Sequence, residues 1–326
     1  MATIIPLVGR DVPYMSEQLE SLERTFQSRP DVEVRFVDAA RPQHELVEAC
    51  RNSPAVIVGM GVGDFTVAVA TQLPDLRLIQ TLTAGLDYLD APGFRNAGFD
   101  VRDNGGANAP AVAEHAVALM VMVQRAMVKR LDSVRDGTWG ERLNRRQEEY
   151  RTLVGLQAGI IGLGRIGSRV GARLHGWKCA LVYHDSADFD AAYEDASGAR
   201  RVTLDELLET SDVVTLHVPL DDSTHHMMSG AQFDQMKDSA ILINTARGPV
   251  VDQAALLAAL EAGGIGGCGL DVLETEPIDP DDPLVLHRNA VITPHMATRS
   301  IQSQRATAEN AARNIAEVLG SPGSDG

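Results

Sequence analysis

The segment Gly162-Leu163-Gly164-Arg165-Ile166-Gly167 decides the fold of this chain. The apolar run Ala158–Ile161 precedes it, and the helical pattern Ile166–His175 follows it. A second apolar run, Ala180–Tyr183, leads to Asp185. A strand, a glycine turn, a helix, a second strand and an acid at this spacing are typical of a dinucleotide-binding unit.

Each glycine of this turn has its own expected role. Gly162 permits the tight turn after the strand, Gly164 leaves room for a pyrophosphate, and Gly167 lets the helix pack closely against the sheet. Free amides at the start of the helix, together with the helix dipole, favour the charge of the phosphates. We expect Asp185 to accept hydrogen bonds from the adenosine ribose. Its carboxylate would repel a 2′-phosphate, and no Lys or Arg lies within 186–190, so the sequence predicts NAD rather than NADP.

The composition limits the classes of protein and partner. The chain has 326 residues, enough for two domains, and 44% of them are hydrophobic, enough for buried cores. A formal net charge of −16 argues against nucleic acid and anionic membranes as partners. The apolar run Ala116–Val123 is too short to span a bilayer and indicates a buried helix. The three cysteines form no CxxC pair and no signal peptide is visible, so we expect a cytoplasmic protein.

Alternating strand and helix patterns predict an α/β fold with parallel sheets. The predicted strands are Ile4–Val8, Val32–Val37, Ala55–Val58, Leu78–Thr81, Phe99–Arg102, Asp212–Leu216, Ala240–Asn244, Gly267–Asp271 and Ala290–Thr293. A long helix is predicted over Ala109–Asp136, and a final helix over Ser300–Leu319.

Three segments of the second half carry reactive residues at the ends of predicted strands. They contain Arg247, then Asp271 and Glu276, and then His295. Ligands of open α/β sheets bind outside the carboxyl ends of the strands. We therefore expect an arginine, acids and a histidine to converge beside a bound nicotinamide.

Taken together, these motifs resemble those of the D-isomer-specific 2-hydroxyacid dehydrogenase family. That family includes glyoxylate/hydroxypyruvate reductases, phosphoglycerate dehydrogenases, formate dehydrogenases and phosphite dehydrogenases. The resemblance covers nearly the whole chain and is strongest from Asn108 to His295. It includes the segments Asn108–Ala116 and His217–Leu220, with Thr224 after the second.

The family implies a fold of two doubly wound parallel-sheet domains. A Rossmann nucleotide domain of residues 104–297 would be inserted into a flavodoxin-like substrate domain. That substrate domain would consist of residues 1–103 and 298–326. Closure of the cleft between them would exclude water from hydride transfer.

The resemblance implies a role for each residue of the catalytic set. Arg247 would hold the substrate carboxylate and polarise the keto oxygen, a task suited to a planar and permanently charged guanidinium. His295 would donate a proton as hydride arrives from NADH. Glu276 would orient the imidazole and raise its pKa. Glu274 competes with Glu276, but the family's working glutamate stands directly before a proline, here Pro277.

The resemblance also implies residues that bind cofactor and substrate. Asp271 would meet the nicotinamide carboxamide, and the loop Thr83–Leu86 would hold the substrate carboxylate through its amides. The predicted cofactor set is Gly162, Gly164, Arg165, Ile166, Gly167, Asp185, His217, Pro219, Thr224, Thr245, Ala246 and Asp271. The predicted substrate set is Thr83, Ala84, Gly85, Leu86 and Asn108. His225 and His226 have no companion ligand set, so no metal site is predicted.

Departures from the family patterns narrow the reaction. Formate dehydrogenases carry Gln where Glu276 stands, and phosphite dehydrogenases carry Lys where Thr83 stands, so both substrates are disfavoured. The sequence predicts NAD(H)-dependent reduction of a small 2-keto acid to the D-2-hydroxy acid, without naming the keto acid. A short phosphoglycerate dehydrogenase and an NAD-sensing corepressor-like protein remain as alternatives. A homodimer built by the long apolar helix and the loop around Trp139 is also expected.

Overall fold

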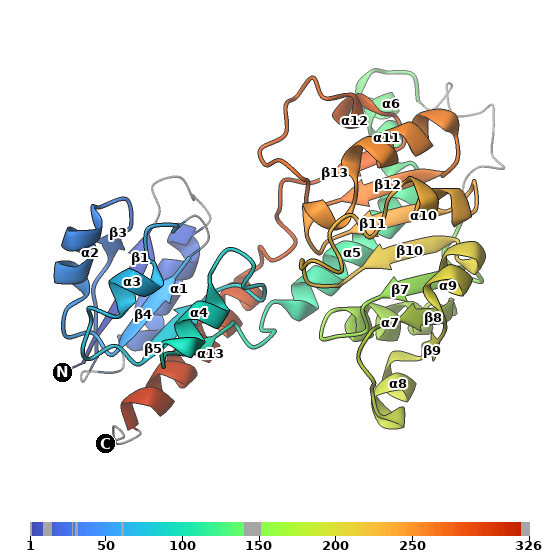
Figure 1. Cartoon of the computed structure of the whole chain (residues 1–326). Coiled ribbons are helices and arrows are strands. Elements are labelled where there is room, and N and C mark those ends of the chain that lie inside the picture. Colours follow the sequence, from blue (N-terminus) through green and yellow to red (C-terminus); the bar gives the residue numbers. More distant parts are fainter. Residues whose placement is uncertain are drawn as a thin grey trace. The chain divides into compact units, whose positions relative to one another are not determined.

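The chain forms two compact units (Figure 1). The first consists of Met1–Asn108 and Arg299–Gly326, and the second of Ala109–Thr298. The computed structural model describes residues 2–8, 15–27, 29, 32–59, 62–139 and 151–320. Each unit is built on one parallel sheet, which confirms the predicted α/β fold class. The domain bounds and roles given above remain predictions.

The first unit has strands in the order β2-β1-β4-β5-β6, and β3 also pairs with β1. Both β4 and β5 are buried along their whole length, as expected of strands with helices on both faces. The helix at the C-terminal end, α13, belongs to this unit and packs its Ala311 and Ile315 in one core with Leu22 of α1. The elements are β1 (Ala2–Val8), α1 (Met15–Phe26), β2 (Val32–Val34), β3 (Val37–Asp38), α2 (Gln43–Cys50), β4 (Ala55–Val58), α3 (Val67–Ala70), β5 (Leu78–Thr81), α4 (Ala91–Asn96), β6 (Asp100–Arg102) and α13 (Ile301–Gly320).

The second unit has seven strands in the order β13-β12-β11-β10-β7-β8-β9. The strand order reverses between β7 and β10, which is the place where doubly wound sheets bind ligands. The elements are α5 (Ala109–Gln124), α6 (Met127–Arg135), β7 (Gln157–Ile161), α7 (Gly167–Gly176), β8 (Ala180–His184), α8 (Ala191–Ser197), β9 (Arg200–Arg201), α9 (Leu204–Thr210), β10 (Val213–Leu216), α10 (Gly230–Gln235), β11 (Ile241–Asn244), the 3₁₀ turn η3 (Gly248–Val250), α11 (Gln253–Ala262), β12 (Gly267–Leu270), α12 (Pro283–Leu286) and β13 (Ala290–Ile292).

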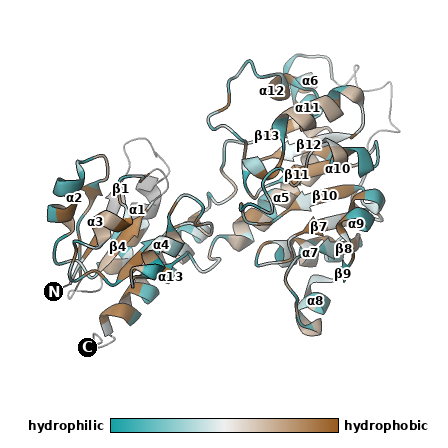
Figure 2. Cartoon of the chain, in the orientation of Figure 1, coloured by the Kyte–Doolittle hydropathy of each residue, from teal (hydrophilic) through white to brown (hydrophobic). Residues whose placement is uncertain are grey.

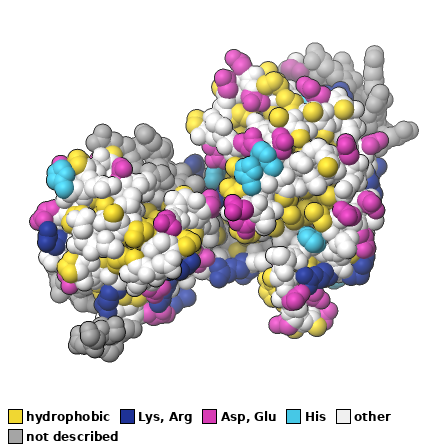
Figure 3. All heavy atoms as spheres, in the orientation of Figure 1, with side chains coloured by type: hydrophobic (Ala, Val, Ile, Leu, Met, Phe, Trp, Pro, Cys, Tyr) yellow, Lys and Arg dark blue, Asp and Glu magenta, His cyan; other side chains and the backbone are white. Residues whose placement is uncertain are grey.

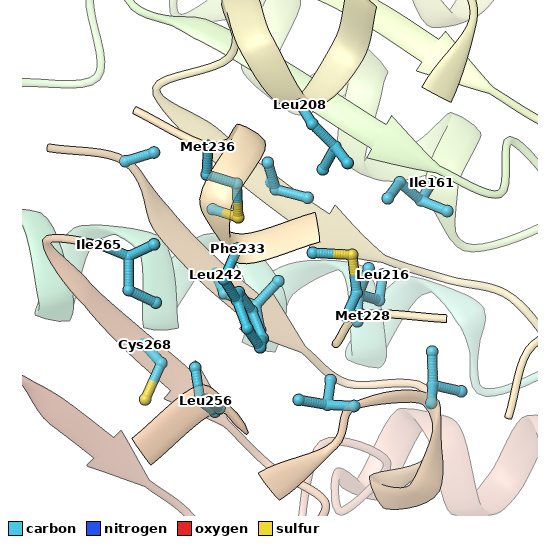
Figure 4. Packing of buried hydrophobic residues seen from close by; sticks show 14 of the residues in the cluster. Ile161, Leu208, Leu216, Met228, Phe233, Met236, Leu242, Leu256, Ile265 and Cys268 are labelled. Atoms are coloured by element: carbon cyan, nitrogen blue, oxygen red, sulfur yellow. The ribbon is translucent and has the colours of Figure 1, made fainter. Parts of the chain in front are cut away.

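Two hydrophobic cores cover the two faces of this second sheet. Successive residues of one strand point to opposite faces, so Ile160 joins the core that includes α5 and α7. Its neighbour Ile161 joins the core that includes α9, α10 and α11. Figure 4 shows the second of these cores, in which Phe233 of α10 packs among residues of the strands. In Figure 2 the hydrophobic residues concentrate in the strands, while Asp and Glu side chains are scattered over the surface in Figure 3.

The predicted helix over Ala109–Asp136 is wrong, because the structure contains two helices instead of one. α5 ends at Gln124 and α6 begins at Met127, with a bend of 65° between them. Ala126 takes a left-handed conformation with φ of 44°, which an α-helix cannot include. Lys129 of α6 donates to the Asn289 side chain at 2.8 Å, a tertiary contact that no local pattern predicts.

No single described helix is long and apolar enough to cross a membrane. The bent pair of α5 and α6 meets the same criteria only when its two helices are taken together. Eight of the sixteen residues of α5 are buried in the protein, as expected for a core helix.

Candidate active site

The glycine turn joins β7 to α7, and each glycine has a different environment. A Cβ on Gly162, whose φ is +91°, would lie 2.7 Å from the carbonyl oxygen of His217, directly after β10. A Cβ on Gly167 would lie 2.0 Å from the carbonyl oxygen of Gly162. A Cβ on Gly164, in contrast, would meet no atom within 4 Å. The fold requires the first and third glycines, whereas open space at Gly164 leaves the backbone accessible to a ligand such as a pyrophosphate.

Asp185 follows β8 and holds the glycine turn through its carboxylate. One oxygen accepts from the backbone N–H of Leu163 at 2.7 Å, and the other accepts from Ala187 N–H at 2.8 Å. The acid therefore lies beside the turn, as a ribose-binding residue must.

Arg201 is a basic neighbour of this acid that the sequence analysis missed. It lies on β9, forms an ion pair with Asp188 and donates to the carbonyl oxygen of Asp185 at 2.8 Å. Arg201 lies sixteen residues after Asp185, well beyond the segment 186–190 that directly follows the acid, and the pairing of β9 with β8 in the sheet brings it close. The strictness of NAD over NADP stays a prediction for this reason.

Two buried polar atoms near the strand ends lack a partner within the chain. They are Thr245 Oγ1, directly after β11, and His217 Nδ1, directly after β10. Burial lowers the pKa of His217 to about 3, so the imidazole is neutral at neutral pH. Unpaired buried donors and acceptors are costly, and a bound dinucleotide would supply partners at this point of the sheet. The donor set thus fits the predicted cofactor.

Other predicted cofactor residues have contacts of their own within the chain. Thr224 donates its hydroxyl to the carbonyl oxygen of Pro219 at 2.7 Å, which stabilises the turn between β10 and α10. Ala246 N–H donates to Asn244 Oδ1 at 2.9 Å. Arg165 is exposed at the start of α7, and Ile166 packs against the core on the α5 side of the sheet. Whether each of these residues contacts the cofactor stays a prediction.

Arg247 lies in the turn between β11 and η3. Asn244 Nδ2 donates to the carbonyl oxygen of Arg247 at 2.8 Å, and Arg247 Nη1 donates to Ala246 O at 2.8 Å. The next residue, Gly248, packs so tightly that a Cβ there would lie 1.9 Å from Leu273 O. The backbone of the arginine is therefore held firmly against the segment that leads to Glu276.

His295 and Glu276 form a direct pair. His295 Nδ1 donates to Glu276 Oε2 at 2.7 Å, and the second carboxylate oxygen accepts from Leu273 N–H at 2.9 Å. Burial raises the pKa of Glu276, but the hydrogen bonds from His295 and Leu273 outweigh it and leave that pKa below its ordinary value. Both side chains are about one-third exposed, so a substrate can reach the imidazole of His295.

The competing Glu274 has a different partner in the structure. Its carboxylate accepts from His226 Nε2 at 2.6 Å, and it is not paired with His295. The ring of His226 stacks on that of His225, with 4.1 Å between the centroids. No group of three or more metal-ligating side chains occurs among the residues that the structure describes.

Asp271 is buried, and both of its carboxylate oxygens accept hydrogen bonds from the chain. Oδ1 accepts from Thr293 Oγ1 at 2.5 Å and from Met296 N–H at 2.9 Å, and Oδ2 accepts from Ala297 N–H at 2.8 Å. Its side chain is only 1% exposed. The structure thus places the Asp271 carboxylate against the loop that carries His295. Its contact with the nicotinamide stays a prediction.

The predicted substrate residues all belong to the first unit. Thr83 follows β5 and donates its hydroxyl to Gly85 O at 2.8 Å, which gives the loop a defined turn. Leu86 packs at the edge of the first unit's core. Asn108 is buried, and its Oδ1 has no partner within the chain. The predicted role of this set, which also includes Ala84, stays a prediction.

Comparison with known proteins assigns this architecture to a family. A family model described as "D-isomer specific 2-hydroxyacid dehydrogenase, NAD binding domain" matches residues 117–297. A glyoxylate reductase from Korarchaeum cryptofilum is 37% identical over 94% of this chain and 90% of its own length. A glyoxylate/hydroxypyruvate reductase B from Yersinia pestis is 34% identical over 85% of this chain and 84% of its own length.

A solved structure supports the same assignment. The NAD-complexed form of a D-isomer specific 2-hydroxyacid dehydrogenase from Lactobacillus delbrueckii ssp. bulgaricus matches with a TM-score of 0.80 and 26% identity. The match covers 98% of this chain and 99% of that one.

Proposed function

Because the chain belongs to the D-isomer-specific 2-hydroxyacid dehydrogenase family, we propose that it reduces a small 2-keto acid to the D-2-hydroxy acid. Membership of this family makes the chain an oxidoreductase, and its cofactor is NAD. One observation carries the proposed mechanism: the imidazole of His295 donates to Glu276 at 2.7 Å in the same unit as the glycine turn. An imidazole oriented in this way is suited to proton transfer at neutral pH.

Each residue of the set has one task in the proposed reaction. The Arg247 guanidinium binds the substrate carboxylate and stabilises the negative charge that develops on the keto oxygen. His295, protonated on both nitrogens, gives the Nε2 proton to that oxygen, while its Nδ1–H stays bonded to Glu276. Glu276 stabilises the imidazolium and holds the ring in one orientation. When bound, NADH would supply the hydride for the carbonyl carbon, so that the products would be the 2-hydroxy acid and NAD⁺.

The proposed substrate class is the small 2-keto acids, with glyoxylate and hydroxypyruvate the first to assay. Two relatives that cover most of the chain are a glyoxylate reductase and a glyoxylate/hydroxypyruvate reductase. A panel of glyoxylate, hydroxypyruvate, pyruvate, 3-phosphohydroxypyruvate and bulkier keto acids, each with NADH and NADPH, identifies the substrate and the cofactor preference. A phosphoglycerate dehydrogenase would favour the phosphorylated keto acid, and a corepressor-like protein would bind NADH but reduce none of them.

The replacement Arg247→Ala tests the mechanism. We expect kcat/KM for the best keto acid to fall by about 10³-fold, roughly 4 kcal/mol, because a charged bidentate partner of the substrate is lost. NADH affinity, measured by fluorescence titration, should stay within about threefold of the wild type. Arg51→Ala, at an exposed arginine after α2, is the control and should leave both quantities unchanged. Undiminished turnover by Arg247→Ala would contradict the assignment.

We also propose that the protein is a homodimer formed through α6. Met127, Val128, Leu131 and Val134 on this helix are between 37% and 55% exposed, and Trp139 after it is 82% exposed. Residues 127, 131 and 134 follow helical spacing and therefore share one face. A contiguous apolar face of this kind marks a contact with another protein, and the same face on a second copy would cover it under two-fold symmetry.

A further inference from the structure

The loop that carries His295 has a strained backbone that other residues must hold. His295 has a φ of +47°, in the left-handed region that side chains other than glycine rarely adopt. Its N–H donates to Asp271 O at 2.9 Å and to Thr293 O at 3.0 Å. Such a conformation persists only where its surroundings stabilise it. The position of the imidazole therefore depends on the groups that fix this loop.

Asp271 is the centre of those groups. Its carboxylate accepts from the N–H groups of the two residues after His295, at 2.9 Å from Met296 and 2.8 Å from Ala297. Burial raises the pKa of Asp271, but its hydrogen bonds outweigh that effect and keep the pKa below the ordinary value. A charged, buried carboxylate accepts strong hydrogen bonds, and any motion of this group moves the loop with it.

The orientation of Asp271 depends in turn on Thr293 and His115. The Thr293 hydroxyl donates to Asp271 Oδ1 at 2.5 Å. Its single proton is thereby used, so it accepts at 2.9 Å from His115 Nε2–H, which also lies 3.4 Å from the same Asp271 oxygen. His115 projects from α5, whose neighbouring Ala113 and Ala116 are fully buried in the core. The chain of contacts thus starts on one of the best-packed helices of the unit.

We propose that His115 is a positioning residue of the acid–base site, which acts through Thr293 and Asp271 to fix the loop that carries His295. The proposal rests on the proposed function, since it gives the imidazole its catalytic task. Loss of the His115 N–H removes the only donor that the structure shows to the Thr293 hydroxyl oxygen. Asp271 keeps its two backbone donors, so the fold should survive while the loop gains freedom.

The test compares His115→Leu, which removes the donor, with His115→Gln, whose amide can donate from a similar position. We expect His115→Leu to lower kcat for keto acid reduction about tenfold, with NADH affinity unchanged, and His115→Gln to restore most of that loss. The kcat of the double variant His115→Leu/Thr293→Val should lie within twofold of that of the slower single variant, because both substitutions act through one chain of contacts. His44→Leu, at an exposed residue of α2, is the control.

Hydrogen–deuterium exchange supplies a readout that does not depend on activity. In His115→Leu the amides of 295–297 should exchange faster, whereas peptides from β7 and α7 should exchange as in the wild type. If His115→Leu does not fold, the same measurements are made on Thr293→Val, which removes the hydroxyl, and on Thr293→Ser, which keeps it. If the wild type reduces a keto acid and His115→Leu has the same kcat and the same loop exchange, the positioning role of His115 is overturned and the proposed function is not. A wild type that reduces no keto acid overturns the proposed function instead.

Discussion

Gly164→Ala should separate cofactor binding from folding, because the structure leaves space for a side chain at Gly164 but not at Gly162 or Gly167, the other two glycines of the turn. A Cβ on Gly164 meets nothing within 4 Å, and its φ lies outside the left-handed region. The variant should therefore fold with a stability within about 0.5 kcal/mol of the wild type. A methyl group where the backbone must approach a pyrophosphate should weaken NADH binding by roughly 2 kcal/mol, or about 30-fold.

Gly167→Ala should have the opposite effect. Its Cβ would lie 2.0 Å from Gly162 O and 3.0 Å from Ile160 Cγ2, so the start of α7 must move by about 1 Å away from β7. Overpacking against backbone of this size costs about 3 kcal/mol. For a domain of this length the loss corresponds to a fall in Tm of about 6–12 °C.

Thermal unfolding and NADH fluorescence titration of both variants check these expectations. Gly176→Ala is the matched control, because its Cβ also meets nothing within 4 Å but stands at the far end of α7. It should change neither stability nor affinity by more than about 0.5 kcal/mol. Wild-type NADH affinity in Gly164→Ala, or wild-type stability in Gly167→Ala, would refute the assignment of roles to the turn.

Two further predictions follow from the second unit. The folded pKa of His217, about 3, lies below the unfolded value of 6.5, so its contribution to stability is full above pH 6.5 and is lost as pH falls from 6.5 towards 3. In His217→Asn, the free energy of unfolding measured with urea should fall less steeply as pH is lowered, by up to about 1.4 kcal/mol per pH unit. An equal dependence of the free energy of unfolding on pH in both proteins would contradict this. Leu131→Glu should convert the dimer to a monomer in sedimentation velocity, whereas Val154→Glu, at another exposed apolar residue, should not. A monomeric wild type at micromolar concentration would exclude the dimer.

Much of the second unit could be predicted from short segments. The glycine turn and the apolar runs around it predicted β7, α7, β8 and the place of Asp185. These elements could be predicted because each depends on the periodicity of apolar residues and on turn residues within a short segment. In the first unit, the strands Ala55–Val58 and Leu78–Thr81 have the predicted bounds. The prediction of one long helix was wrong because the chain bends at Ala126. Contacts between residues distant in sequence, such as that of Lys129 with Asn289, fix the direction of α6.

The sequence by itself determined the parallel α/β fold and the NAD cofactor, since glycine spacing and strand pattern are local properties of the chain. The family resemblance favoured Glu276 over Glu274, and the tertiary structure shows the two contacts directly, with Glu276 bonded to His295 and Glu274 bonded to His226. Only the tertiary structure brought Arg201 to Asp185 and His115 to Thr293, pairs separated by 16 and 178 residues. Contacts of that range depend on the register of a whole sheet and on helix packing, and no segment of sequence contains that information.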